Sequence, residues 1–356
     1  MRFIVTSDIH IHNWSHNATI NDRGINSRLW HTSQRIREVI DIGRIEKVDG
    51  WLNAGDLLHT KKIDGEVLDV AARAFADCPY PIYSIYGNHD LVSSVAEIGS
   101  SRAFSGKIRY LDGLNGNVVK LADGTNLCGI SFHSNRTKLI GNLTGLPLVP
   151  DNTSILMLHQ GIIGALMAEG YIADNEDSIL PKDIIDKAGI VICGHFHTAQ
   201  FIDLVKEEFF KVTGPTKTNY KSHKTALIPG ALEQHNYGDT GQERGCWILD
   251  TGEQSVRFIP LQSPKFIIAD EKIDQKLLKG NYVKWVGQKA GIPIGTISES
   301  FTVEIPIQVK NVASHSYHLN LSDPVDKVLT EYVTNNKQEG LDNDKLFKEG
   351  KRLLCS

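Results

Sequence analysis

Five short polar segments, each directly after an apolar run, constrain this chain more than any other feature of its sequence. In chain order they are Asp8-Ile9-His10, Gly55-Asp56, Gly87-Asn88-His89-Asp90, Leu158-His159 and Gly194-His195-Phe196-His197. The apolar runs before them predict buried strands at residues 2–6, 51–54, 81–86, 154–158 and 190–193. A strand followed by a polar cluster, repeated five times, predicts an α/β fold with one polar site along the carboxyl ends of its strands.

The side chains in these segments are the ligand types that a pair of divalent metal ions needs, because carboxylate, imidazole and amide oxygen suit hard to borderline cations. We expect Asp56 to bind both ions, since one carboxylate has two oxygens. The other expected ligands are Asp8, His10 and His197 for the first ion, and Asn88, His159 and His195 for the second. Ions about 3.5–4 Å apart can clamp a phosphate during in-line attack, so the set predicts phosphoester hydrolysis. We expect manganese, with iron or zinc as alternatives.

Two residues of the third segment have expected roles other than metal binding. His89 is placed to protonate the leaving alkoxide as general acid, and Asp90 is expected to orient its imidazole. The nearby histidines are expected to be surface or loop residues: His12, His16, His31 and His59. Of these, His12 is the one that could also reach the site or the substrate from its loop.

Charge and length set limits on the function. The chain has 356 residues and a net charge of −4, so no overall basic character indicates a nucleic-acid partner. Any DNA would have to contact a local patch and the metals. A basic segment at residues 211–224 is either a solvated loop or a loop that contacts DNA phosphates. The five scattered cysteines and the absence of an N-terminal apolar leader or a long apolar run predict a cytoplasmic protein with no membrane span.

The rest of the chain divides into three expected domains. Residues 1–262 would form the catalytic domain, with helices at about 27–45 and 67–76 and an antiparallel sheet between 201 and 262. Residues 263–321 mix strands and polar loops. Residues 322–356 read as two helices, with Asp323-Pro324 at the start of the first and Gly340 in the break between them.

The five segments resemble the signature of the calcineurin-like metallophosphoesterase superfamily, over about residues 2–262. The resemblance implies a two-sheet αββα sandwich, with the metal roles given above. That superfamily includes protein phosphatases, nucleotidases, cyclic nucleotide phosphodiesterases and nucleases, so the resemblance alone does not give the substrate.

Two further segments resemble SbcD-type DNA repair nucleases. The run IPGALEQHNYGD at residues 228–239, followed by RGCW at 244–247, is similar to a stretch that lies just after the last metal-binding histidines of that family. The helices of residues 323–356 are similar to the element by which such subunits bind a coiled-coil ATPase of the SbcC type. The resemblance implies DNA as substrate, a homodimer, and a capping region at residues 263–321 that guides DNA. The chain departs from the family at His10-Ile11-His12-Asn13, where Leu-Gly usually follows the first histidine.

Three functions remain open at this point. The first is a metal-dependent DNA exonuclease and endonuclease that acts in recombination or double-strand-break repair. The second is a small-molecule or phosphoprotein phosphoesterase with the same metal core, which the acidic net charge favours. The third is a scaffold subunit that keeps the metals but works mainly by binding its partner.

Overall fold

The side chains of strand β1 (Arg2–Thr6) alternate between two apolar cores. Phe3 and Val5 belong to one cluster of buried residues and Ile4 belongs to another, and all three are fully buried. A strand covered on both faces must lie inside a layered fold. The structure, a computed structural model, describes residues 1–92, 99–111, 118–146, 154–168, 171–174, 178–220, 224–288, 291–293, 298–303, 325–335 and 342–354.

Two large sheets, each of seven strands in the described part, form the centre of the fold. The order in the first is β13 (Thr216–Asn219), β16 (Ser255–Pro260), β15 (Gly245–Asp250), β1, β2 (Gly50–Asn53), β3 (Ile82–Ser84) and β4 (Ile108–Tyr110). The order in the second is β12 (Glu208–Lys211), β11 (Gln200–Asp203), β14 (Thr225–Ile228), β10 (Ile190–Gly194), β7 (Ser154–His159), β6 (Asn126–Ile130) and β5 (Val119–Lys120). A separate hairpin pairs β8 (Leu166–Ala168) with β9 (Tyr171–Ile172).

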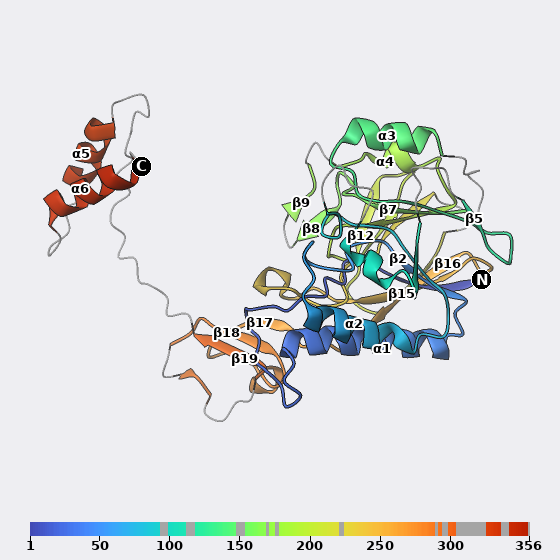
Figure 1. Ribbon diagram of the computed structural model, residues 1–356, viewed down its shortest axis with the longest axis horizontal. Helices are drawn as coiled ribbons and strands as arrows, with labels where there is room; N and C mark the ends of the chain where they lie inside the picture. Colours follow the sequence, from blue (N-terminus) through green and yellow to red (C-terminus); the bar gives the residue numbers. More distant parts are fainter. Residues whose placement is uncertain are drawn as a thin grey trace. The chain divides into compact units, whose positions relative to one another are not determined.

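The sheets pack face to face, and helices cover their outer faces (Figure 1). Helices α1 (Ser27–Ile45) and α2 (Gly65–Ala76) pack on the first sheet through the cluster that contains Ile4 and Trp51. Helices α3 (Arg136–Thr144) and α4 (Pro181–Ile184) cover the second sheet through the cluster that contains Leu156 and Val191. The predicted αββα sandwich is confirmed.

Helix α1 forms where the periodic apolar pattern predicts it. The side chain of Asn26 caps its first turn by accepting hydrogen bonds from the main-chain N–H groups of Arg28 and Leu29, at 3.0 and 3.2 Å. Leu29, Ile36, Val39 and Ile40 are buried against the first sheet, as the spacing of those residues requires.

The prediction of a single antiparallel sheet at residues 201–262 is wrong. Strands β11, β12 and β14 extend the second sheet, whereas β13, β15 and β16 extend the first. Strand β14 pairs in parallel with β10 on one side and antiparallel with β11 on the other. All four residues of β14 are buried, as expected for an interior strand of a covered sheet.

The chain has two compact units, Met1–Ile305 and Pro306–Ser356. The first unit ends with a small parallel sheet of β17 (Phe266–Ala269), β18 (Tyr282–Trp285) and β19 (Ser300–Val303). Short 3₁₀ helices occur at Ser100–Phe104, Tyr237–Asp239 and Gln275–Leu277. The second unit contains α5 (Val325–Asn335) and α6 (Asn343–Leu354). Asp323, Pro324 and Gly340 lie outside the described residues, and the predicted domain boundaries stay predictions.

Among the described helices, none combines the length and the apolar character needed to cross a membrane.

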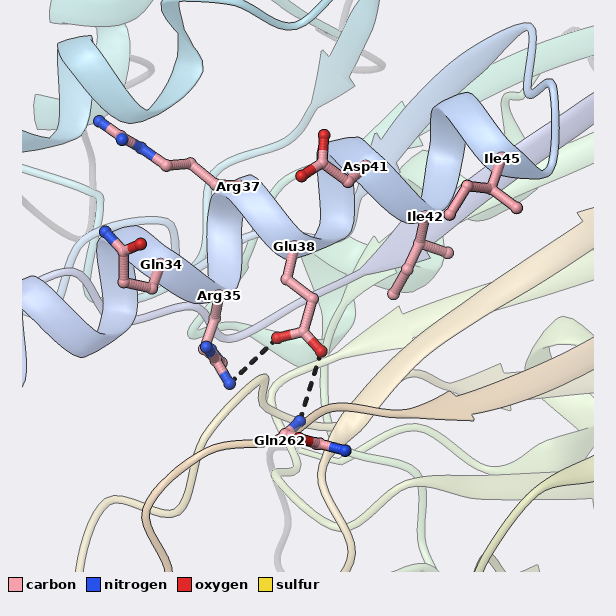
Figure 2. Close-up of a pocket in the computed structure, with 8 residues that line it drawn as sticks. All are labelled: Gln34, Arg35, Arg37, Glu38, Asp41, Ile42, Ile45 and Gln262. Atoms are coloured by element: carbon pink, nitrogen blue, oxygen red, sulfur yellow. Dashed lines mark hydrogen bonds and ion pairs between the residues drawn. The ribbon is translucent and has the colours of Figure 1, made fainter. Parts of the chain in front are cut away.

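A groove of about 490 Å³ runs along α1. Figure 2 shows Glu38 joined to both Arg35 and Gln262. Its carboxylate lies 3.0 Å from the Arg35 guanidinium and accepts the main-chain N–H of Gln262 at 3.4 Å. The lining residues of the groove are Gln34, Arg35, Arg37, Glu38, Asp41, Ile42, Ile45 and Gln262. None of them is a predicted metal ligand, so this groove is separate from the polar site of the five segments.

Candidate metal centre

Parallel strands bring the five segments to one place. Strands β1, β2 and β3 run parallel to one another, as do β7 and β10 in the facing sheet. Asp8 and Asp56 follow the carboxyl ends of β1 and β2, and His159 is the last residue of β7, paired with Gly194 of β10. The carboxyl ends of neighbouring parallel strands meet at one sheet edge, so the polar side chains converge there.

The residues predicted for the first ion lie together. The Nε2 atoms of His10 and His197 are 3.1 Å apart. Asp8 Oδ1 lies 3.9 Å from the Nε2 of His10 and 4.0 Å from that of His197. Asp8 and His10 are buried, whereas His197 is 31% exposed and forms part of the open side of the site.

The residues predicted for the second ion also converge. The Asn88 side-chain oxygen lies 3.2 Å from His159 Nε2 and 3.0 Å from His195 Nδ1. The His159 ring is oriented by its Nδ1, which contacts the carbonyl oxygen of Ala54 at 2.7 Å. This contact leaves Nε2 directed into the site, which is the arrangement that metal-binding histidines commonly have.

Asp56 lies between the two groups. Its Oδ2 is 3.7 Å from His10 Nε2 and 3.3 Å from His159 Nε2. Its other oxygen accepts the main-chain N–H of His89 at 2.9 Å, and the carboxylate is almost fully buried. This position between both sets is the one that a shared ligand requires.

The main chain is strained at the candidate ligands. Asp8, His10 and Asp56 have φ near +50°, and His195 has φ of 101°. These are four of the eight non-glycine residues with positive φ in the described part of the chain. Such conformations cost about 1–3 kcal/mol each and cluster at functional sites, where the surrounding structure holds them.

Gly87 allows the third segment to approach Asp56. A Cβ atom on Gly87 would overlap the carboxylate and the main-chain nitrogen of Asp56. Glycine is therefore required here for a close approach.

The charge of the site fits bound cations. Asp8, Asp56 and Asp90 are 0–1% exposed. Among the described residues, the ion-pair partners of Asp8 and Asp56 are histidines, and no lysine or arginine pairs with either. Buried carboxylates without a cationic partner are costly. Burial alone would lower the pKa of His159, but the Asp56 carboxylate outweighs it and raises the pKa to about 9. A cation at this place would take over the role of that proton.

Two further imidazoles of the site, those of His195 and His10, have a lowered pKa, which favours the neutral form that binds metal. Burial, with the neighbouring His159, lowers the pKa of His195 to about 4. Burial and the nearby His235 hold the pKa of His10 well below its usual range. A metal ion binds only the neutral form of imidazole, so a depressed pKa removes competition from protons at pH 7.

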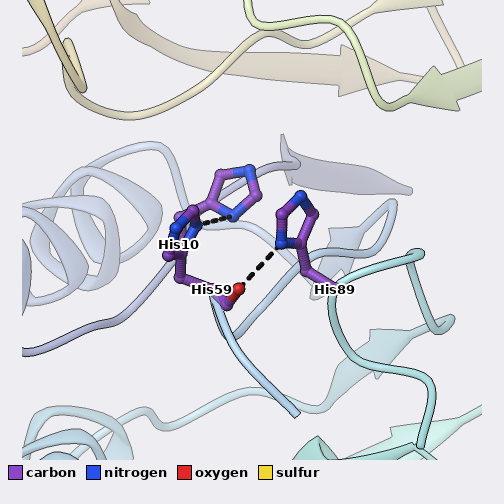
Figure 3. Close-up of side chains that lie close together, drawn as sticks. All are labelled: His10, His59 and His89. Atoms are coloured by element: carbon purple, nitrogen blue, oxygen red, sulfur yellow. Dashed lines mark hydrogen bonds between the residues drawn. The ribbon is translucent and has the colours of Figure 1, made fainter. Parts of the chain in front are cut away.

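His89 is oriented differently from the prediction. Its Nδ1 lies 2.7 Å from the carbonyl oxygen of His59, as Figure 3 shows. The Asp90 carboxylate instead accepts the main-chain N–H groups of Gly87, Leu57 and Leu58, at 3.0–3.2 Å. Asp90 thus joins the second and third segments, because its buried oxygens satisfy main-chain donors that have no strand partner. Burial, with the nearby Asp56, raises the pKa of Asp90 to about 7.

His59 lies in a loop, as expected, but its half-buried side chain belongs to the site. Its Nδ1 is 3.3 Å from the Nδ1 of His10, and its ring stacks on that of His89 with centroids 4.9 Å apart (Figure 3). His12 and Trp14 pack against His59 at centroid distances of 5.0 and 4.3 Å.

Two of the other histidines lie away from the ligands as expected, and one was missed. His16 is exposed, and His31 contacts the Tyr282 hydroxyl at 2.9 Å. His235, which the sequence did not single out as a site residue, packs against His10 and His197 with ring centroids 5.0 and 4.9 Å apart. His235 lies in the segment at residues 228–239, shortly after Pro229-Gly230-Ala231. Its position just after the last histidine segment is the sequence signal that could have identified it as a site residue.

Within the basic segment at residues 211–224, Thr216–Asn219 form strand β13. Lys217 lies in β13, where it pairs with Glu253 at 3.0 Å, and Lys224 pairs with Asp186 at 2.6 Å. Tyr220 between them is buried. Residues 221–223 lie outside the described residues.

A family model described as calcineurin-like phosphoesterase matches residues 1–199, which is more than half of the chain. The chain belongs to this family. Calcineurin-like phosphoesterases hydrolyse phosphoester bonds and use a dinuclear site of divalent metals, and the converging side chains supply candidate ligands for it. The assignment of individual residues to each ion stays a prediction.

Solved structures similar to this chain share little of its sequence. The protein TT1561 of Thermus thermophilus is 10% identical, with a TM-score of 0.41 over 73% of this chain and 99% of that one. A metallophosphoesterase from Sphaerobacter thermophilus is 15% identical, with a TM-score of 0.34 over 74% and 88%. A dimetal phosphatase from Danio rerio is 11% identical, with a TM-score of 0.39 over 70% and 91%. No curated protein matches the chain.

Proposed function

We propose that this phosphoesterase is a DNA nuclease, a two-metal phosphodiesterase with exonuclease and endonuclease activity that acts in recombination or double-strand-break repair. The observation that carries the chemistry is the convergence of two ligand sets on a shared carboxylate, Asp56. Two ions held there, which we propose to be manganese, would polarise the phosphate and activate the attacking water.

The protein's own residues would position the substrate and supply a proton. Buried Asp8, His10, Asp56 and His159 form the closed side of the site, while Asn88, His89, His195 and His197 are half-buried and form its accessible side. The Nδ1–H of His89 donates to the His59 carbonyl, which leaves Nε2 to hold the proton that the leaving alkoxide needs.

The segment that resembles SbcD-type nucleases is continuous with the metal centre. Ala231 donates its main-chain N–H to the carbonyl oxygen of His197 at 3.1 Å. Gly230 has φ of 75°, and a Cβ atom there would crowd the same carbonyl at 2.8 Å. The turn therefore supports the histidine segment directly. This contact supports the DNA proposal, because the most family-specific part of the sequence adjoins the predicted ligands.

We propose that residues 323–356 bind an SbcC-like coiled-coil ATPase and that the protein is a homodimer. Within this unit, Leu329 of α5 is buried beneath α6, where a Cβ atom on Gly350 would contact it at 3.0 Å. Lys351 pairs with Asp326 at 2.9 Å. The two helices thus pack as a pair, a form suited to grip an extended helical partner. Co-purification of the partner with the full chain, and its loss on deletion of residues 323–356, would test the proposal.

The decisive experiment uses end-labelled linear DNA with manganese, beside bis-p-nitrophenyl phosphate as a small ester. We expect the wild type to shorten the DNA and the Asp56→Ala variant to leave it intact. Intact DNA with hydrolysed small ester would refute the nuclease and keep the phosphoesterase. Each reaction is repeated with the ATPase partner, since the isolated subunit can depend on it.

The main alternative is a small-molecule or phosphoprotein phosphoesterase with the same metal core. It is favoured by the net charge of −4 and by the acidic partners of Lys217 and Lys224, which reduce the positive field available for a DNA backbone. Salt dependence separates the two. Protein binding releases counterions from DNA, and this release becomes less favourable as the salt concentration rises. DNA cleavage should therefore slow steeply at high salt, whereas hydrolysis of a small phosphomonoester should change little.

A further inference from the structure

His235 is a buried histidine with an unused nitrogen beside the predicted first metal. It is 8% exposed, and among the described residues its Nε2 has no hydrogen-bond partner. An imidazole nitrogen that is buried without a hydrogen-bond partner loses its hydration and has no interaction that offsets the loss. In native structures such an unpaired buried group calls for an explanation, such as a catalytic role or a bound ion or water.

A ring nitrogen of His235 lies within reach of two predicted ligands. His10, His197 and His235 each offer a ligand atom, and these atoms are within 4.8 Å of one another. The three rings meet edge to face, with centroids 4.9–5.0 Å apart. This arrangement directs the nitrogens of three imidazoles from three different segments toward one volume.

Hydrogen bonds to both the N–H and the carbonyl oxygen of His235 fix its main chain and so help to hold its ring at the site. Its N–H donates to Asp239 Oδ2 at 2.7 Å, and Asp239 is held by the buried Arg244 at 2.9 Å. Its carbonyl oxygen accepts from the buried Arg28 guanidinium at 2.9 Å. Trp14 stacks on the ring, with centroids 5.6 Å apart. Supporting contacts of this kind are what a preorganised metal ligand needs.

We propose that His235 is a further protein ligand of the first metal ion. The ion would then be bound by Asp8, His10, His197 and His235, with Asp56 shared. Three imidazoles suit iron, zinc or cobalt better than they suit magnesium. With His235 as a ligand, the first metal site would therefore discriminate between these ions and magnesium more strongly than the second. The inference rests on the proposed metal centre but does not depend on DNA being the substrate.

The test measures metal binding and not turnover. Chelator-treated full-length protein is titrated with Mn²⁺, followed by the electron paramagnetic resonance signal of the free ion, and with Co²⁺, followed by its visible absorption. His235→Phe keeps the size and stacking of the ring but cannot bind metal. We expect it to bind one ion as the wild type does and the other at least about tenfold more weakly. We also expect an altered Co²⁺ spectrum, because loss of a nitrogen ligand changes the coordination.

Two further variants make the result unambiguous. His16→Phe, at an exposed histidine, should bind both ions as the wild type does. His235→Gln keeps a polar side chain of similar length and serves if the phenylalanine variant does not fold, with the same tenfold loss expected. Folded His235 variants with wild-type affinity for both ions and an unchanged Co²⁺ spectrum would overturn the proposal. Failure of the nuclease would show only as uncut DNA and would leave these titrations unaffected.

Discussion

The Nδ1 atom of His89 lies 2.7 Å from the main-chain carbonyl oxygen of His59. Because a carbonyl can only accept, Nδ1 carries a proton and Nε2 is the nitrogen left for proton transfer. The His59 ring also stacks on His89, with an angle of 18° between the planes. One residue therefore fixes both the tautomer and the orientation of the predicted acid.

Replacing His89 by glutamine should slow DNA hydrolysis about 10²–10⁴-fold, the range that general acid catalysis supplies. Metal content should not change, because the main-chain N–H that contacts Asp56 remains. The loss should be much smaller with bis-p-nitrophenyl phosphate, since p-nitrophenolate leaves without protonation. His16→Gln is the matched control and should behave as the wild type does. A His89→Gln protein that has lost metal would refute the assignment of His89 as the acid.

Substitution of Asp56 should reduce metal binding and activity more than substitution of any other single ligand. The isosteric Asp56→Asn change removes charge from a carboxylate that lies 3.7 Å from His10 and 3.3 Å from His159, so both ions should be lost or greatly weakened. We expect activity to fall by at least about 10³-fold, because metal ions supply several kcal/mol of transition-state stabilisation. Elemental analysis of the purified variant measures the bound metal directly.

The comparison variant for this prediction is His195→Ala. His195 contacts Asn88 of the second set and should affect mainly the second ion. Equal metal loss in the two variants would contradict the role of Asp56 as the shared ligand.

Local sequence was enough to predict the strands that carry the site. The apolar runs before Asp8, Asp56 and His159 are only 4–6 residues long and are bounded by polar residues, so their length favours strands over helices. The partition of β11–β16 between two sheets depends on long-range pairing that no local pattern contains. The antiparallel pairing of β15 with β1 joins residues almost 250 positions apart.

The same distinction explains what was missed in the site. His59 and His235 reach it through loops whose paths are set by contacts such as that of Arg28 with the His235 carbonyl, which sequence spacing does not reveal. The sequence predicts that Asp90 orients His89, because the two residues are neighbours in the chain. In the fold, the unpaired main-chain N–H groups of Leu57 and Leu58 bind its carboxylate instead.

A methyl group at position 87 should damage the site without removing any ligand. In Gly87→Ala the new Cβ would overlap the Asp56 carboxylate and main chain, so the third segment must move away. We expect a loss of about 1–3 kcal/mol in the free energy of unfolding, as for other overpacked positions, and weaker metal binding. Urea denaturation and metal titration measure the two effects.

The matched control is Gly141→Ala in α3, where an added Cβ meets no atom within 4 Å. Alanine is favoured over glycine in a helix, so this variant should gain about 0.5–1 kcal/mol in stability. Equal stability of the two alanine variants would show that position 87 tolerates a side chain.

Metal removal should destabilise the fold itself. Asp8, Asp56 and Asp90 are buried together, and the described lysines and arginines form no ion pair with them, so bound cations would offset their mutual repulsion. Metal that binds only the folded state adds about 2.7 kcal/mol to the free energy of unfolding when its free concentration is 100 times its Kd. We therefore expect the melting temperature to fall on dialysis against a chelator and to return as Mn²⁺ is added, in proportion to the logarithm of its concentration. In Asp56→Asn this dependence should largely vanish, and the chelated variant should melt below the chelated wild type, because the buried ion pair of Asp56 with protonated His159 is gone. A melting temperature that is the same with and without Mn²⁺ would contradict the metal centre.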